Sequence, residues 1–146
     1  MKAVTIDEGR VAARIKVVEE HVRAENAHEL DATMATLNET PYFKLNNDEF
    51  GGQDGVRAFY ASLFTAFPDL YIEVTRRYAS DEAIIVEATL SGTHKNEWNG
   101  IAATGRRVQL PFTAIFPFDE NDSLTGERVY CDNALVLRQL GVLPAQ

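Results

Sequence analysis

The sequence predicts an α+β fold, because helical and extended patterns occupy different parts of the chain. Apolar residues recur at helical spacing in the first half, whereas the second half changes to strand-like segments with partial alternation. Helices followed by strands, without βαβ alternation, favour an antiparallel sheet. We therefore expect a cone-shaped, curved antiparallel sheet with the N-terminal helices packed on its concave face and a pocket inside.

Three helices are predicted before the strands. The first begins at Asp7, a residue type that caps helix N-termini. A shorter helix is predicted over 30–37, and a third over 56–67, which Pro68 ends. Residues 38–55 are rich in glycine and asparagine, and we expect a loop there with at most one short strand. The stripe that faces the core in the first helix is Val11, Ile15, Val18 and Val22.

Four strands and a last helix are predicted in the second half. The strands are expected over the ranges 71–79, 82–94, 108–118 and 127–131. Pro111 and Pro117 favour an edge position or a bulge for the third of them. The final helix, over 134–140, should end at Gly141.

Composition excludes several classes of protein. A chain of 146 residues is long enough for one domain, expected over 1–146, and its net charge of −8 argues against nucleic acid or an anionic membrane as partner. The single Cys131 excludes an internal disulfide, and no cysteine or histidine spacing indicates zinc. We therefore expect no metal. We also expect a cytoplasmic protein, since the N-terminus lacks the apolar run of a signal peptide.

Asp132 is the carboxylate on which a functional prediction depends. Strand alternation places Arg128, Tyr130 and Asp132 on one side of a strand, with Glu127, Val129 and Cys131 on the other. Either side can face the core. Asp132 also directly precedes the last helix, where it or Asn133 can serve as the N-cap. A capping carboxylate is held in its charged form, whereas one that faces a cavity is free to move protons.

Histidines and aromatic residues supply the other candidates. His94 ends a strand and can orient or protonate a nearby carboxylate, although a structural role is the commoner one for a lone histidine. His21 and His28 lie among charged residues and are interpreted as solvated. Trp98, in a polar loop, is expected to cover the mouth of a pocket or to pack on another subunit. The further residues predicted to line the pocket are Tyr130, Phe112, Phe116, Tyr60 and Phe64.

Residues 119–122, Asp-Glu-Asn-Asp, contain carboxylates but lack the spacing of a calcium loop. A solvated turn is the better interpretation.

The sequence resembles the SnoaL-like polyketide cyclase family, within the group that shares the nuclear-transport-factor-2-like cone fold. The matching segments are GQDGVRAFYASLFTAFPDL (52–70), SGTHKNEWNGIAATGRRV (91–108), AIFPF (114–118) and ERVYCDNALVLRQLGVLP (127–144). The resemblance implies a homodimer with an apolar pocket that binds a small hydrophobic molecule. It also implies that Asp132 is the acid/base of an intramolecular aldol-type cyclisation, with His94 nearby and no cofactor.

Two departures from the family pattern are present. Arg128 occupies a position that is commonly tryptophan, and the strand 108–118 is almost wholly apolar. Three hypotheses follow: a cyclase or related isomerase, a non-catalytic protein that holds an apolar molecule, and a structural module with a filled cavity. The fold hosts all three.

Overall fold

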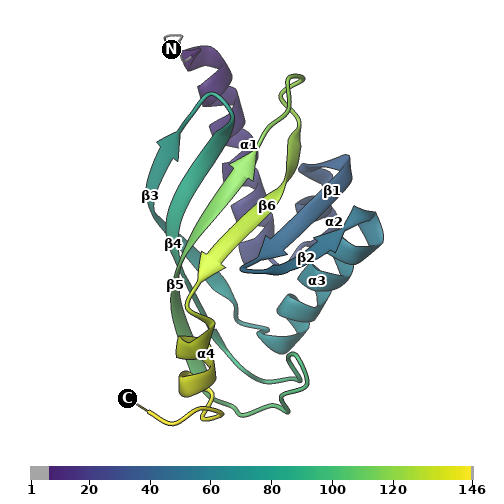
Figure 1. The fold of residues 1–146 in the computed structure, drawn as a ribbon. Coiled ribbons are helices and arrows are strands. Elements are labelled where there is room, and N and C mark those ends of the chain that lie inside the picture. The colour runs from purple at the N-terminus through teal and green to yellow at the C-terminus, as the bar shows by residue number, and fades with distance from the viewer. Residues whose placement is uncertain (1–6, 146) are drawn as a thin grey trace.

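A six-stranded sheet forms the frame of the protein in the computed structural model, which describes residues 7–145 (Figure 1). The sheet order is β2-β1-β6-β5-β4-β3. The strands are β1 (Leu37–Leu45), β2 (Asp48–Gly51), β3 (Tyr71–Ala79), β4 (Ala83–Thr93), β5 (Arg107–Pro117) and β6 (Leu124–Cys131).

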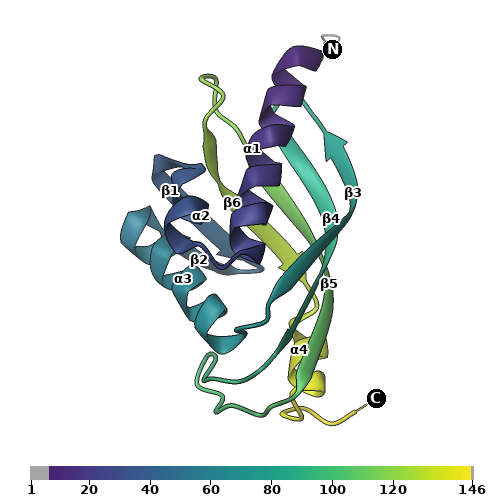
Figure 2. The same ribbon diagram turned by 180° about the vertical axis from the view of Figure 1, so that it is seen from behind.

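Three helices cover one face of this curved sheet (Figure 2). They are α1 (Glu8–Asn26), α2 (Leu30–Ala35) and α3 (Gly52–Ala66). Asp7 caps α1, as predicted, because its carboxylate accepts a hydrogen bond from the amide of Arg10 at 3.0 Å. A fourth helix, α4 (Asn133–Gln139), follows β6 directly. The opposite face of β3 to β6 carries none of these helices (Figure 1).

The α+β cone predicted from the sequence is confirmed, with one difference in the sheet. β1 pairs with β6 in parallel, whereas the other neighbouring strands are antiparallel. The difference arises in residues 38–55, where the predicted loop is wrong over its first part: β1 and β2 form a hairpin there. Asn46, at the hairpin turn, has φ 52°, a conformation that asparagine tolerates well.

The edge position predicted for the strand with two prolines is also wrong. β5 lies between β4 and β6 in the sheet. It pairs with β6 only from Phe112 to Ile115, so Pro111 and Pro117 both fall outside that ladder. Proline is tolerated in this inner strand because the pairing with β6 is short.

The turn at 119–122 is more than a solvated tip. Arg14 of α1 is buried and donates to the Asp122 carboxylate at 2.9 Å and to the carbonyl oxygens of Asp81 and Asp119. A buried guanidinium needs such partners. The contact ties α1 to the turns at this end of the sheet. Over residues 7–145, no helix is both long and apolar enough to cross a membrane.

Candidate active site

A small apolar cavity lies between the sheet, α1, α3 and α4. It encloses about 90 Å³ and its wall is mostly aliphatic and aromatic. The residues in the wall are Glu25, Phe43, Leu45, Phe59, Leu63, Phe67, Ile72, Leu90, Trp98, Val108, Leu110, Phe112, Glu127, Val129, Cys131, Asn133 and Val136. Glu25 and Glu127 are the only carboxylates in that wall, so they define its polar part.

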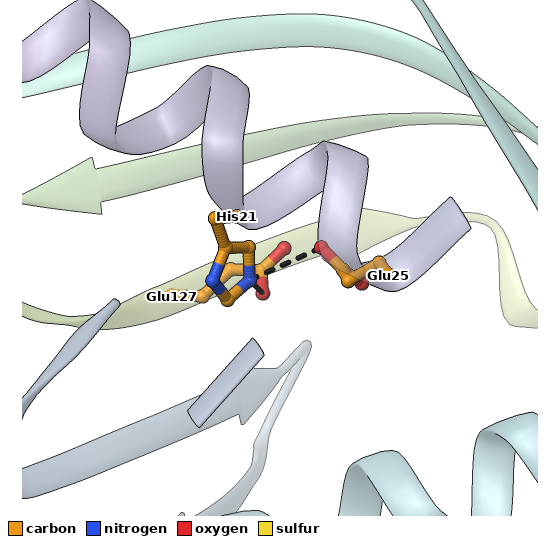
Figure 3. Close-up of side chains that lie close together, drawn as sticks. All are labelled: His21, Glu25 and Glu127. Carbon is orange, nitrogen blue, oxygen red and sulfur yellow. Dashed lines mark hydrogen bonds and ion pairs between the residues drawn. The ribbon is translucent and has the colours of Figure 1, made fainter. Parts of the chain in front are cut away.

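The two glutamates meet one histidine in the interior (Figure 3). His21 and Glu25 lie one helical turn apart on α1, and Glu127 extends from β6 towards them. The His21 Nε2 atom is 3.1 Å from Glu25 Oε1 and 3.3 Å from Glu127 Oε2. All three side chains are at least 95% buried. We call His21, Glu25 and Glu127 the buried triad.

Neighbouring hydroxyl groups decide where the protons of His21 lie. Thr36 donates its hydroxyl proton to the Thr33 carbonyl oxygen at 2.7 Å, so its oxygen accepts the 2.7 Å hydrogen bond from His21 Nδ1–H. The Tyr60 hydroxyl donates to Glu127 Oε2 at 2.7 Å. Nε2 is therefore left facing oxygen acceptors, and a second proton on the ring suits this position.

Electrostatics lead to the same protonation state. Burial alone would lower the pKa of His21, but attraction from the Glu25 charge and hydrogen bonding to Glu127 raise it to about 10. Burial, together with repulsion from Glu127, raises the pKa of Glu25 to about 7. At neutral pH the triad thus contains an imidazolium beside a carboxyl group that is able to gain or lose a proton.

The hydrogen bonds of the triad leave one oxygen without a partner. Glu25 Oε1 is close to His21 Nε2, but it makes no hydrogen bond of acceptable geometry with any described residue. Nε2–H is directed at Glu127 and Tyr60 as well, and one proton cannot serve every acceptor. Buried polar atoms of this kind are few in native proteins, and each calls for an explanation such as a catalytic role or an unobserved partner.

The triad is also the group of described residues best placed to ligate a metal. It offers one nitrogen and two oxygen atoms that lie within 4.8 Å of one another. Metal ligation requires a neutral imidazole. The high pKa of His21 means that a proton already occupies the position between the carboxylates at neutral pH. The arrangement therefore fits proton chemistry better than metal binding.

Asp132 does not face the cavity: of the two orientations that the sequence leaves open, the structure shows the helix cap, and the cavity-facing acid that the resemblance implies is wrong. Its carboxylate caps α4 by accepting from the Leu135 amide at 3.2 Å, and it lies 3.6 Å from Arg138. The side chain is 61% exposed. Strand alternation in β6 turns Glu127, Val129 and Cys131 inward instead, so that Arg128 and Tyr130 face the uncovered side of the sheet. Arg128 there donates to the Tyr42 hydroxyl at 3.2 Å.

His94 is fully buried but lies outside the cavity wall. Its Nδ1 lies 3.0 Å from the Thr104 hydroxyl and 3.3 Å from the Thr104 amide nitrogen, and its Nε2 has no hydrogen-bond partner among the described residues. The ring packs on Phe67, a residue of the wall. Asp132 and His94 make their polar contacts with different residues, and the structure does not bring them together.

The predicted aromatic lining divides into three groups. Trp98 and Phe112 lie in the cavity wall. Tyr60 and Phe116 are buried beside His21, each edge to face with its ring. The other two residues, Phe64 and Tyr130, lie elsewhere: Phe64 stacks on His28, and Tyr130 is 42% exposed.

Sequence reasoning missed the buried triad. Reading His21 and His28 as solvated is wrong: His21 is fully buried, and His28 is half-buried and bonds the Leu70 carbonyl oxygen. The signal was spacing, because His21 and Glu25 follow Val18 at intervals of three and four residues on the stripe that faces the core. Glu127 likewise shares strand parity with Val129 and Cys131.

Comparisons with known proteins agree with this architecture. The model of the SnoaL-like polyketide cyclase family matches residues 15–140. No curated protein matches the sequence. Among solved structures, a proposed SnoaL-like polyketide cyclase from Jannaschia sp. CCS1 superimposes with a TM-score of 0.82 at 20% identity, over 99% of this chain and 100% of that one.

Two further solved structures share the fold. AclR from Streptomyces galilaeus, a proposed hydroxylase, is 23% identical with a TM-score of 0.80, over 91% of this chain and 98% of that one. A protein of ketosteroid isomerase-like fold from Catenulispora acidiphila, in complex with trimethylamine, is 14% identical. It superimposes with a TM-score of 0.73 over 87% of this chain and 93% of that one.

Proposed function

Because the chain belongs to the SnoaL-like polyketide cyclase family, we propose that it is a cyclase or isomerase which moves protons by acid/base catalysis on a small hydrophobic substrate. One observation carries the proposal: a buried carboxyl group, Glu25, lies in the wall of an apolar cavity with its pKa raised to about 7. An acid/base group is most effective when its pKa lies near the operating pH.

Glu25 takes the role that the family resemblance gives to Asp132. In the ionised state Glu25 accepts a proton from an activated carbon of the substrate. The resulting enolate attacks a carbonyl carbon of the same molecule, and the protonated Glu25 returns its proton to the new alkoxide. An isomerase returns it to another carbon instead. Neither sequence of steps needs a cofactor.

His21 and Glu127 set the state of that acid. The imidazolium keeps a positive charge beside the negative charge that develops on the enolate, and Glu127 holds the imidazolium in place at 3.3 Å. Apolar walls limit the entry of water, which strengthens these charge interactions. A cavity of about 90 Å³ is smaller than the roughly 150 Å³ that accommodates benzene, so the substrate is compact or the walls move apart to admit it.

Hydrogen–deuterium exchange tests the proposal without knowledge of the natural substrate. Small ketones such as butanone are incubated with the protein in D₂O, and the loss of their α-proton signal is followed by NMR. We expect exchange above the buffer rate, a decrease of about 100-fold or more in Glu25→Gln, and an unchanged rate in Asp132→Asn. Exchange that survives in Glu25→Gln, or is lost in Asp132→Asn, contradicts the assignment.

A non-catalytic binder is the second candidate function. The apolar wall favours it, and the neighbour from Catenulispora acidiphila holds a small amine within the same fold. Trp98 is the only tryptophan of the chain and lies in the wall, so its fluorescence reports occupancy directly. Ligand binding without exchange of any ketone supports this candidate over the enzyme.

We further propose that the uncovered face of the sheet forms a homodimer. Tyr78, Ile85 and Ile115 lie in one row across β3, β4 and β5, with Tyr130 on the same face of β6. Sedimentation should give twice the chain mass of 16.3 kDa, and Ile115→Glu should give the monomer. A wild-type monomer at about 100 µM, well above a micromolar dissociation constant, contradicts the dimer.

A further inference from the structure

The charges around the cavity do not balance. Glu25 and Glu127 lie in its wall, and no lysine, arginine or histidine does so in the described part of the chain. His21, behind the wall, supplies one positive charge for two carboxylates. Tyr60 is the other ionisable group in contact, and it donates a hydrogen bond to Glu127 while neutral. When Glu25 is ionised, one negative charge is left without a counter-ion in an apolar space.

Glu25 is the carboxylate with fewer hydrogen bonds, although His21 Nε2 lies 3.1 Å from its Oε1. Glu127 Oε2 receives the Tyr60 hydroxyl at 2.7 Å and faces His21 Nε2 at 3.3 Å. Glu25 Oε1 makes no hydrogen bond of acceptable geometry with a described residue, although the side chain is 96% buried from solvent. Because one imidazolium faces two buried carboxylates, the second negative charge is costly, and either a proton or a cation relieves the cost.

The cavity wall suits a cation as the group that balances the second negative charge. The aromatic residues of the wall are Phe43, Phe59, Phe67, Trp98 and Phe112. Their π-faces attract alkylammonium ions, while their edges and the aliphatic residues accommodate alkyl groups. A carboxylate combined with aromatic rings is a general means of recognising a substituted ammonium ion.

We propose that this cavity binds a small alkylammonium ion, with the charged nitrogen at Glu25 and the alkyl groups against the aromatic wall. The inference rests on the cavity of the proposed function and concerns a ligand that pairs with ionised Glu25 and is not turned over. An enclosed volume of about 90 Å³ limits the ligand to a few carbon atoms in the absence of rearrangement. A ligand that carries a carboxylate should not bind, because the two wall glutamates repel it and no described cation in the wall attracts it.

Three molecules of nearly equal shape test the proposal: isobutylamine, isobutanol and isobutyrate. Binding is measured by Trp98 fluorescence and by calorimetry at pH 8, where an amine that ionises near about 10.4 is still charged. We expect isobutylamine to bind at least tenfold more tightly than isobutanol, and isobutyrate not to bind. Binding of the amine should weaken about tenfold from pH 8 to pH 6, as the Glu25 carboxyl takes up a proton.

Glu25→Gln is the decisive variant, since it keeps the shape of the side chain and removes its charge. It should bind the amine and the alcohol equally well, whereas Glu19→Gln, an exposed position on the same helix, should keep the tenfold preference. Retained alcohol binding shows that the Glu25→Gln cavity is intact. Equal binding of amine and alcohol by the wild type, no binding of either, or a preference that persists in Glu25→Gln overturns the proposal. These results do not depend on the ketone exchange rate, so the two proposals fail separately.

Discussion

Two carboxylates five residues apart, Glu127 within β6 and Asp132 just after it, show how position changes the surroundings of an acid. Glu127 is 4% exposed and contacts His21 and Tyr60, whereas the Asp132 side chain is 61% exposed and caps α4. The alternation of side chains along β6 turns Glu127 inward, whereas Asp132 accepts a hydrogen bond from an amide in the first turn of α4. The two carboxylates therefore differ in their surroundings: water and a peptide amide at Asp132, and the Tyr60 hydroxyl and the His21 ring at Glu127.

The largest change in stability is expected from His21→Leu. Removing the imidazolium leaves two buried carboxylates without their cation, and we expect the free energy of unfolding to fall by about 3–5 kcal/mol at pH 8. Urea unfolding measures the change. Arg138→Leu, which removes the cation beside the exposed Asp132, should change it by less than about 1 kcal/mol. Equal effects of the two variants would remove the distinction between the sites.

The pH dependence of stability is the next largest effect. The folded-state pKa of His21 is raised to about 10 from 6.5 and that of Glu25 to about 7 from 4.5, so the folded state binds more protons than the unfolded state. The contribution of His21 is complete below pH 6.5 and is lost as pH rises towards 10, while that of Glu25 is lost between 4.5 and 7. We expect stability to fall by roughly 1 kcal/mol per pH unit between pH 6.5 and 9. Urea unfolding of the wild type over this range measures the slope, and a stability that rises with pH contradicts the raised pKa values.

Tyr60→Phe tests how much the buried Glu127 depends on its neighbours, since the variant removes one hydrogen-bond donor to Glu127 and keeps the aromatic ring. Loss of a hydrogen bond to a buried carboxylate should lower the free energy of unfolding by about 1.5–3 kcal/mol. Thermal unfolding measures the loss, and Tyr130→Phe on the exposed face serves as the control, with an expected change below about 0.5 kcal/mol. A neutral Tyr60→Phe would mean that Glu127 does not depend on this hydroxyl.

The smallest effect is expected at Asp132. Asp132→Ala removes the α4 cap and should cost about 1 kcal/mol, whereas Asp132→Asn keeps a good capping residue and should cost close to nothing. Urea unfolding distinguishes these outcomes. A loss above about 3 kcal/mol in Asp132→Asn would show that the carboxylate has a role beyond the cap.

The fold was accessible from the sequence because hydrophobic periodicity records which face of each element is buried. β3 was predicted over its full length, and α4 within one residue at each end. The β1–β2 hairpin was missed, because Pro41 and two asparagines dominate the local signal and the pairing with β6 is long-range. No local pattern specifies that β1 adds to the sheet in parallel.

The site was less accessible, because its residues carry charges where the stripe predicts apolar side chains. Val18 identifies the buried face of α1, and His21 and Glu25 continue it. Their polarity favoured a solvated interpretation, since an isolated buried charge is costly. The third member of the triad, Glu127, follows Glu25 by 102 residues in the chain, so the triad becomes visible only after folding. Resemblance drew attention to Asp132 instead, where the cap reading from local sequence agrees with the structure.

The ionisation of Glu25 tests the account most directly. With ¹³C-labelled glutamate, the side-chain carboxyl resonance that disappears in Glu25→Gln is assigned to Glu25 and followed from pH 4 to pH 10. A midpoint near 7 is the predicted result, as expected of a carboxyl group enclosed beside Glu127. A midpoint below 5, close to that of an exposed glutamate, would contradict the account and remove the acid on which the proposed chemistry depends.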